Sequence, residues 1–216
     1  MRTVLTLIAF AALSMQAAPT PNVVLILADD LGWGDVSCYQ PGNRFQTPEI
    51  DRIAREGLRM TNAHAPHSVC SPTRYAVLTG RYCWRTFLRE GVLPGYAKPL
   101  IAKRRMTLAS LLKQHGYATG AFGKWHIGMG WTPVKGDPGD FHYGSQIHAS
   151  GSALAAISRR VNHAAPISGG PTDLGFDTFF GTPSNRGRIP VFIRDNRVVG
   201  SPLRNKSGLM QDPTMR

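Results

Sequence analysis

Residues 107–126 read TLASLLKQHGYATGAFGKWH, an order that predicts a helix directly followed by a strand. Thr107 suits the N-cap of the helix, three leucines repeat at helical spacing, and Gly116 ends it. The next residues, Tyr117–Phe122, favour a strand that leads into a glycine and a polar segment. A helix that feeds a strand in this way is a building unit of α/β proteins.

Other strands are predicted on both sides of this unit. Val23–Ala28 is an unbroken apolar run rich in β-branched residues, which is typical of a central parallel strand buried on both faces. Alternation of apolar and polar residues indicates a second strand over Leu58–Ala65. Further strands are expected at Phe176–Phe180, Val191–Ile193 and Val198–Val199.

Two more helices are predicted before residue 107. Thr47 and Pro48 supply a cap and a first-turn proline for one helix, which Gly57 closes. Pro72 starts the other helix and Gly80 ends it. The alternation of strands and helices predicts an α/β fold with a central, mostly parallel sheet flanked by helices.

Composition changes along the chain. Residues 131–175 are rich in Gly, Pro, Ser and His, and predict a long excursion with one short helix around Ala153–Arg160. Basic residues become more frequent after Pro183. The whole chain has 25 Lys+Arg against 13 Asp+Glu, which gives a net charge of +12. This charge either attracts a sulfated polysaccharide or forms a solvated face. No basic motif is interleaved with aromatic residues, so nucleic acid is not an expected partner.

The 216 residues, 42% of them hydrophobic, exclude a disordered polymer and a fibrous repeat. Three cysteines are too few for a disulfide framework. Cys38 and Cys83 could pair after export, but free buried cysteines are the default expectation.

The first residues predict an export signal. Arg2 precedes the apolar run Val4–Leu13, and small residues follow up to Ala18. This order is typical of a secretory signal peptide over residues 1–18, and the run is too short to cross a membrane. We therefore expect a secreted or periplasmic protein without a stable membrane anchor.

Asp29 and Asp30 directly follow the apolar run Val23–Ala28. In open α/β sheets, ligands bind at the carboxyl ends of strands. Two adjacent carboxylates at such a place suit a hard divalent cation, which prefers oxygen ligands. The alternative is a solvated Asp-Asp turn, which is also common after strands.

The sequence CSPTR, residues 70–74, brings a cysteine to the N-terminus of a predicted helix. Backbone N–H groups and the helix dipole favour an anion there, and the guanidinium of Arg74 adds a planar donor. By itself, the position of Cys70 also fits a thiolate nucleophile or a small buried side chain.

With the residues that follow, this stretch resembles the sulfatase family, in the alkaline-phosphatase superfamily. The family signature is Cys or Ser, any residue, Pro, a small residue and Arg, then four residues and Thr-Gly-Arg. Thr73 departs slightly from the usual serine or alanine. Matching motifs occur in the family's order at Pro21-Asn22, Asp29-Asp30-Leu31-Gly32, Gly34-Asp35, Cys70 to Arg74, Thr79-Gly80-Arg81 and Lys124-Trp125-His126-Ile127-Gly128.

The resemblance implies chemistry on a modified cysteine. In the family, a maturation enzyme oxidises the signature cysteine, here Cys70, to formylglycine. One hydroxyl of the aldehyde hydrate attacks the sulfur of a sulfate ester, and the other helps to expel sulfate. Asp29, Asp30 and the modified Cys70 would ligate Ca²⁺.

The resemblance also assigns roles around the nucleophile. Arg74 would hold the hydrate, Lys124 would bind the sulfate of the substrate, and His126 would accept the proton of the second hydroxyl. Ser184, after Gly-Thr-Pro, stands where the family often has a serine that contacts substrate. The other histidines carry no assigned role: loop positions are expected for His64 and His67, and no role is chosen among His142, His148 and His163.

The implied function is arylsulfatase-type hydrolysis of sulfate esters, and a sulfated carbohydrate is the expected natural substrate. Two alternatives are a phosphate or phosphonate ester hydrolase of the same superfamily and a non-catalytic fragment. Family members are considerably longer, so residues 21–216 are expected to form the truncated N-terminal part of the catalytic domain. The remaining calcium ligands and the leaving-group acid would lie in the later half, and we expect weak calcium binding and little turnover from these residues alone.

Overall fold

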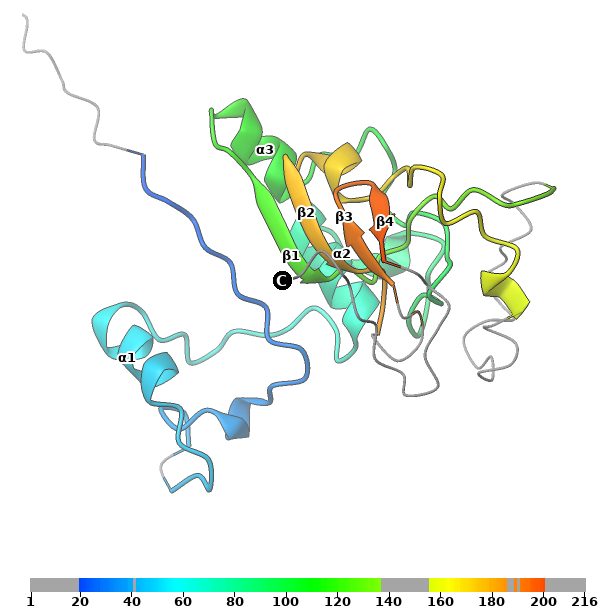
Figure 1. Ribbon diagram of the computed structural model, residues 1–216. Helices are drawn as coiled ribbons and strands as arrows, with labels where there is room; N and C mark the ends of the chain where they lie inside the picture. Colours follow the sequence, from blue (N-terminus) through cyan, green and yellow to red (C-terminus); the bar gives the residue numbers. More distant parts are fainter. Residues whose placement is uncertain (1–19, 41, 137–155, 186–188, 190, 201–216) are drawn as a thin grey trace, which may run out of the picture. The chain divides into compact units, whose positions relative to one another are not determined.

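A computed structural model describes residues 20–40, 42–136, 156–185, 189 and 191–200. The chain divides into two compact units, residues 1–59 and 60–216 (Figure 1). The predicted signal peptide, residues 1–18, lies outside the described residues. The predicted helix Ala153–Arg160 is described from residue 156 onwards and contains a short helical stretch at 156–158.

Among its described residues, the first unit contains a 3-10 turn, η1 (Trp33–Asp35), and one α-helix, α1 (Pro48–Glu56), as predicted from its proline. Thr47 occupies the N-cap position, but its hydroxyl donates to the Asp51 carboxylate at 3.0 Å instead of binding a backbone N–H of the helix. Ser37 donates to the same carboxylate at 2.7 Å. Hydrogen bonds from Ser37 and Thr47 lower the pKa of Asp51, so this loop and the helix form one polar cluster.

The prediction of a strand over Val23–Ala28 is wrong. The segment has no regular secondary structure and its side chains are exposed, with 82% exposure for Val24. A strand needs a neighbouring strand to pair its backbone groups, and none of the strands in the described residues pairs with this segment. The strand predicted over Leu58–Ala65 is absent for the same reason.

Besides the stretch at 156–158, the described part of the second unit contains α2 (Cys70–Thr79), η2 (Cys83–Arg85), α3 (Leu108–Gln114) and η4 (Pro171–Leu174). Gly80 ends α2 in the left-handed conformation, with φ of 64°, which a residue without Cβ adopts at little cost. The Thr107 hydroxyl accepts the backbone N–H of Ser110 at 3.0 Å and caps α3. Both predicted helix ends are therefore confirmed.

The described residues of this unit form a sheet of four strands: β1 (Gly120–Lys124), β2 (Thr178–Thr182), β3 (Phe192–Arg194) and β4 (Arg197–Val199). They lie side by side in this order (Figure 1). β1 and β2 pair in parallel, whereas the β2–β3 and β3–β4 pairs are antiparallel. The α/β class is confirmed, but the sheet of the described residues is mixed instead of mostly parallel. A two-residue turn between β3 and β4 produces the second antiparallel pair.

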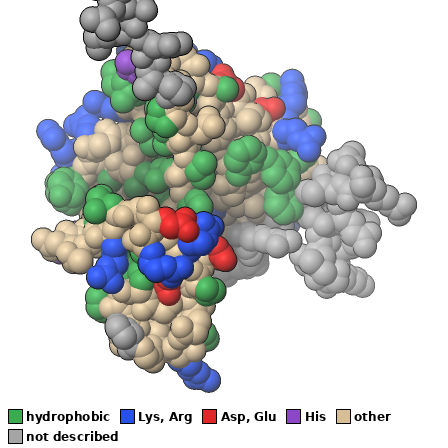
Figure 2. Space-filling view, turned by 90° about the vertical axis from the view of Figure 1, so that its left-hand side faces the viewer, with side chains coloured by type: hydrophobic (Ala, Val, Ile, Leu, Met, Phe, Trp, Pro, Cys, Tyr) green, Lys and Arg blue, Asp and Glu red, His purple; other side chains and the backbone are tan. Residues whose placement is uncertain are grey.

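One hydrophobic core joins the sheet to α2. It includes Tyr75 from α2, Phe179 from β2 and Ile193 from β3, all at most 3% exposed. Trp125, directly after β1, packs edge to face against Phe179 with ring centroids 6.2 Å apart. Hydrophobic side chains also reach the surface, among Lys and Arg side chains (Figure 2).

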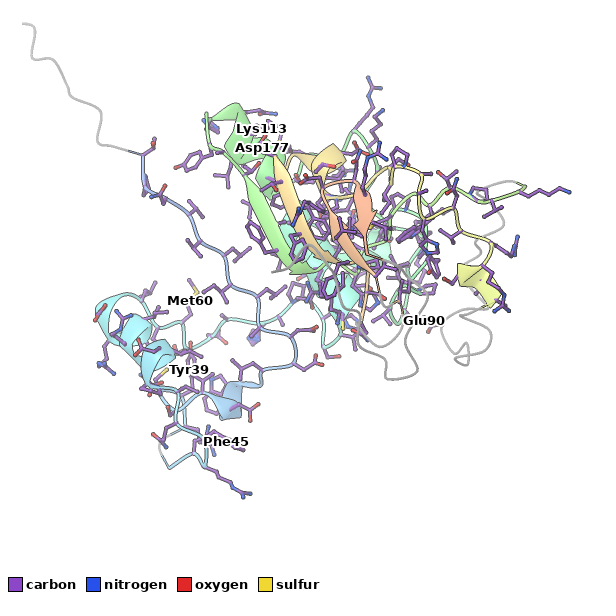
Figure 3. The ribbon with its side chains drawn as sticks, viewed as in Figure 1. Tyr39, Phe45, Met60, Glu90, Lys113 and Asp177 are labelled. Atoms are coloured by element: carbon purple, nitrogen blue, oxygen red, sulfur yellow. The ribbon has the colours of Figure 1, made fainter. Side chains whose placement is uncertain are left out.

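Asp177 connects α3 and β1 to β2. Its carboxylate forms an ion pair with Lys113 of α3, and the two side chains meet in Figure 3. It also accepts the backbone N–H of Thr119 at 2.8 Å and the Thr119 hydroxyl at 3.1 Å. The hydrogen bonds from Lys113 and Thr119 lower the pKa of Asp177 to about 2. These contacts of Asp177 with Lys113 and Thr119, called the clasp below, fix the start of β1, the strand that leads to the candidate site.

Candidate active site

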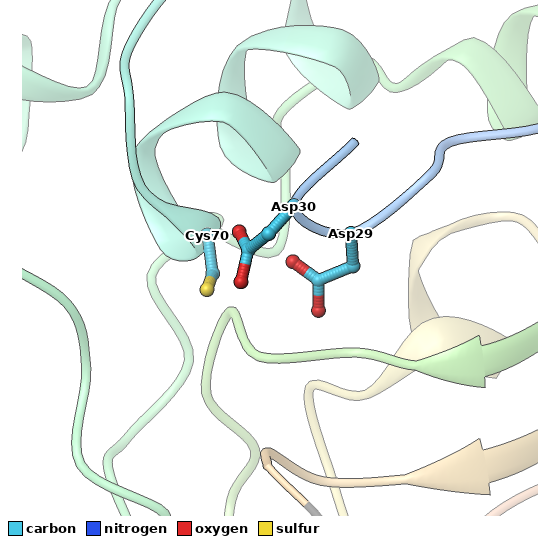
Figure 4. Close-up of side chains that lie close together, drawn as sticks. All are labelled: Asp29, Asp30 and Cys70. Atoms are coloured by element: carbon cyan, nitrogen blue, oxygen red, sulfur yellow. The ribbon is translucent and has the colours of Figure 1, made fainter. Parts of the chain in front are cut away.

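Cys70 is the first residue of α2, so the helix begins two residues before the predicted start at Pro72 (Figure 4). Its side chain is half-buried. The ammonium of Lys124 donates to the Cys70 sulfur at 3.0 Å. The first turn of a helix leaves backbone N–H groups unpaired and carries a positive partial charge. The sulfur therefore lies where both the helix and a side chain favour a negatively charged group.

Arg74 follows Cys70 by one helical turn, so both side chains lie on the same face of α2. The guanidinium of Arg74 donates to the backbone carbonyl of Lys124. Lys124 is the last residue of β1. This bond ties the helix that carries the cysteine to the strand that carries the lysine, and so holds the two predicted site residues together.

His126 is 4% exposed and adopts a left-handed backbone conformation, with φ of 56°. Its Nε2 lies 2.9 Å from the carbonyl oxygen of Leu93. Because a carbonyl oxygen only accepts, Nε2 carries the proton of the neutral ring, and Nδ1 carries the lone pair. The N–H of Leu93 in turn donates to the Ser71 hydroxyl at 3.1 Å. One residue thus connects His126 to the first turn of α2.

Leu93 and Ser71 are the site residues that the sequence did not single out. Both are buried, and both act through hydrogen bonds that join segments far apart in the chain. No local pattern marks a leucine whose backbone N–H and carbonyl are both used in this way. Only the position of Ser71 inside the cysteine motif gave a signal.

The strand β2 positions the residues after Lys124. The backbone N–H of Trp125 donates to the carbonyl oxygen of Thr182 at 2.9 Å, and the backbone N–H of His126 donates to the carbonyl oxygen of Pro183 at 3.0 Å. The pairing of β1 with β2 therefore continues into the motif. Ser184 comes next, and its hydroxyl is buried without a hydrogen bond to any described residue. Its substrate contact stays a prediction.

Asp29 and Asp30 lie in the first unit, at the end of the extended segment (Figure 4). Their side chains are exposed, and carboxylate oxygens of the two lie within 4.8 Å of each other. Asp30 has φ of 72°, which is unusual for a residue with a side chain. Two carboxylates at this separation repel each other unless a cation lies with them, so the pair suits an oxygen-binding cation.

The remaining histidines differ in their surroundings. His64 hydrogen-bonds to the Asn62 side chain at 2.9 Å and is exposed, and His67 is exposed too, as expected for loop residues. His163 lies 3.1 Å from the Tyr96 hydroxyl, and burial lowers its pKa. His142 and His148 lie outside the described residues. The structure has all three cysteines free: Cys83 is buried, as expected, whereas Cys38 is half-buried.

Comparison with protein families matches residues 21–190 to the model described as Sulfatase. The match takes in well over half of the chain. The chain belongs to the sulfatase family. The matched segment includes Cys70, Arg74, Lys124 and His126, the four residues assigned to the candidate site around the cysteine.

Individual sulfatases share much of this sequence. The N-acetylgalactosamine-6-O-sulfatase of Bacteroides thetaiotaomicron is 38% identical over 186 residues, which are 86% of this chain and 31% of that protein. Human arylsulfatase A is 44% identical over 125 residues, 57% of this chain and 24% of that protein. The chain therefore spans less than a third of the length of these two sulfatases.

Solved sulfatase structures show the same fold. A Bacteroides thetaiotaomicron structure, described with the metabolism of multiple glycosaminoglycans, has a TM-score of 0.67 and 36% identity, and the match covers 86% of this chain and 33% of that one. Ps i-CgsB in complex with k-i-k-neocarrahexaose has a TM-score of 0.51 and 29% identity, covering 74% and 28%. Among the described residues, no helix has the length and apolar character needed to cross a membrane.

Proposed function

We propose that this sulfatase-family chain takes part in sulfate ester hydrolysis through Cys70 oxidised to formylglycine. The hydrogen bond from Lys124 to Cys70, at 3.0 Å, carries the proposal, because it joins the cation of one family motif to the nucleophile of another. Formylglycine, made by a maturation enzyme, supplies as its hydrate one hydroxyl to attack sulfur and a second to release sulfate without an external water.

Lys124 and Arg74 would have different roles: Lys124 would bind the sulfate, and Arg74 would position Lys124 and the hydrate. Lys124 would bind the sulfate and offset the negative charge that its oxygens gain in the transition state. Arg74 commits one guanidinium N–H to the Lys124 carbonyl. A guanidinium has five N–H groups, so Arg74 can position the backbone of Lys124 and still hold a hydroxyl of the hydrate.

His126 would accept a hydroxyl proton at Nδ1. The hydrogen bond from Nε2–H to the Leu93 carbonyl supports this assignment, because it leaves the lone pair of the neutral ring on Nδ1. The same bond limits rotation of the ring. Burial of His126 keeps bulk water from competing for this proton.

Asp29, Asp30 and the modified Cys70 would hold Ca²⁺, which would supply positive charge at the anionic substrate. The donor chemistry of the aspartates fits, since both offer exposed carboxylate oxygens. A thiolate is a poor ligand for this hard cation, whereas the oxygens of an aldehyde hydrate suit it. The modification would therefore change both the nucleophile and the fit to the metal.

A sulfated carbohydrate is the substrate class that we propose. Three observations support it. One relative is named an N-acetylgalactosamine-6-O-sulfatase, one similar structure was solved in complex with k-i-k-neocarrahexaose, and this chain has a net charge of +12. The predicted signal peptide, residues 1–18, would deliver the protein to the periplasm or the outside. There it would meet such glycans.

Mass spectrometry of the tryptic peptide that contains Cys70, from protein made in its native host, tests the modification. We expect the aldehyde and its hydrate in place of the thiol. A peptide that carries only unmodified cysteine would contradict the proposal. Turnover of an aryl sulfate against the matching aryl phosphate, by protein from the same host, separates sulfatase from phosphatase activity.

Replacement of Lys124 tests the proposed roles. In active protein, Lys124→Met should lower kcat/KM for an aryl sulfate by about 10²–10³-fold, the effect of removing a group that stabilises transition-state charge. Lys103→Met, which removes an exposed lysine elsewhere in the same unit, serves as the matched control. Equal kcat/KM values for the two variants would remove Lys124 from the mechanism.

A calcium titration tests the proposed metal site. Asp29→Asn should weaken calcium binding, and this measurement requires no turnover.

A further inference from the structure

A small pocket opens in the second unit beside the N-terminal turn of α2. It is small and open to solvent, so a ligand would lie against its wall and not inside an enclosed cavity. Eight residues line it: Pro66, His67, Pro72, Cys83, Trp84, Leu88, Arg89 and Glu90. His67 and Pro72 stand on either side of Cys70 in the sequence, but Cys70 is not part of the wall. The pocket therefore adjoins the turn of the nucleophile without containing it.

The aromatic side of the pocket is the ring of Trp84, which Tyr82 holds in place. Trp84 is 48% exposed, and its ring stacks on that of Tyr82 with centroids 4.0 Å apart and an interplanar angle of 13°. Tyr82 does not line the pocket, so it braces the indole from outside. An exposed indole held in this way is the kind of surface on which the C–H face of a sugar ring packs, because both are apolar and nearly flat.

The polar wall of the pocket carries a donor and an acceptor side by side. Arg89 offers several N–H donors that match a carboxylate or a sulfate. The neighbouring carboxylate of Glu90, labelled in Figure 3, accepts hydrogen bonds from hydroxyl groups. His67 accepts the backbone N–H of Val69 at Nδ1, at 3.3 Å, so its neutral ring presents Nε2–H as a further donor. All three lining side chains are exposed.

We propose that this pocket binds a sugar ring that carries an anionic group, and that this ring is the neighbour of the one whose sulfate ester is cleaved. The apolar indole would pack on the ring, Arg89 would bind its carboxylate or sulfate, and Glu90 would bind its hydroxyls. The identity of the occupant as a neighbouring ring rests on the proposed function. Binding itself needs no oxidation of Cys70.

The test is a calorimetric titration of the Cys70→Ala chain, which cannot form formylglycine. The probes are 6-sulfated N-acetylgalactosamine and a disaccharide that joins it to a uronic acid. We expect Trp84→Ala to weaken binding of the disaccharide by about tenfold, the loss of one aromatic contact, and to leave binding of the monosaccharide unchanged. Trp84→Phe should restore part of the affinity. Phe87→Ala, another exposed aromatic residue that does not line the pocket, should bind the disaccharide like the parent.

A second pair of variants tests the anionic group. Arg89→Gln should weaken binding of the uronic acid disaccharide but not of a disaccharide with a neutral neighbouring sugar, and Arg85→Gln, outside the pocket, should change neither. A disaccharide with a sulfated in place of a carboxylated neighbour shows which anion is preferred, and Arg89→Gln should weaken both. Equal disaccharide affinities of Trp84→Ala and the parent, at matched melting temperatures, would overturn the proposal, as would absence of disaccharide binding at millimolar concentration. Since these titrations involve no turnover, their failure leaves the sulfatase proposal intact, and an unmodified Cys70 leaves the pocket proposal intact.

Discussion

Val23–Ala28 and β1 both lead into residues of the candidate site, yet their structures are the reverse of what their sequences suggest. Val23–Ala28 is continuously apolar, but it is exposed and forms no strand. β1 contains two glycines and a lysine, and it pairs with β2 along its whole length. A partner strand in register, and not apolar content, therefore decides which segment becomes a strand.

The difference extends to the residues that follow. After β1, Trp125 and His126 continue the hydrogen bonds to the last residue of β2 and the residue that follows it, so the lysine and histidine of the motif have fixed positions. After Val23–Ala28, the aspartates are exposed. Substitutions along the two segments should therefore have very different effects on stability.

The largest effect is expected at Phe179, in the strand that pairs with β1. Phe179→Ala removes a ring that is 1% exposed and packs against Trp125. We expect the free energy of unfolding to fall by about 3–5 kcal/mol in urea denaturation. Phe122→Ala, on β1 itself but 76% exposed, should change it by less than about 0.5 kcal/mol. Similar losses for both variants would show that the core is not where we place it.

The next effect concerns the close approach of β1 and β2. A Cβ at Gly181 would lie 1.8 Å from the carbonyl oxygen of Gly123, its register partner. Gly181→Ala should therefore separate the strands and lower the free energy of unfolding by about 1–3 kcal/mol. Gly34→Ala, where the added Cβ would make only an ordinary contact, is the control. A neutral Gly181→Ala would argue against the parallel pairing.

A smaller effect is expected at the clasp that holds the start of β1. Asp177→Asn removes the partner of Lys113 and should lower the melting temperature by a few degrees at neutral pH. Because the pKa of Asp177 is about 2 in the folded chain and 3.8 without its partners, its contribution is complete above pH 3.8 and is lost as the pH falls toward 2. The difference in melting temperature between parent and variant should shrink over that interval. A constant difference down to pH 2 would contradict this account.

The smallest effect is expected in the unpaired segment. Val24→Ser replaces a side chain that is 82% exposed, so the free energy of unfolding should change by less than about 0.5 kcal/mol. Circular dichroism in the far ultraviolet should also stay the same. A loss of 2 kcal/mol or more would mean that the segment is buried against a partner in solution, and the contrast with β1 would disappear.

The helices could be predicted closely because their signals are local. Pro48 and Thr107 mark starts, and Gly80 marks an end, through backbone conformations and caps within one turn of the chain. Strands were harder. Apolar runs indicate segments that can pair, but β2 lies more than 50 residues after β1 in the sequence, and no local pattern states which segments meet.

The candidate site shows the same division. Cys70, Arg74, Lys124 and His126 follow from motifs, and the structure brings Cys70, Arg74 and Lys124 together through hydrogen bonds. The link from Leu93 to His126 could not be predicted, because it depends on main-chain groups that every residue possesses.

The sequence by itself determined the family, most of the helix boundaries and the residue types of the site, since these depend on short-range order along the chain. The tertiary structure decided that 107–126 ends in a paired strand while Val23–Ala28 does not. It also decided which nitrogen of His126 carries the proton, and that Trp84 and Arg89 share a pocket. Each of these depends on contacts between segments distant in sequence or on the packing of side chains in space. The free energy of such contacts cannot be predicted from a local sequence pattern.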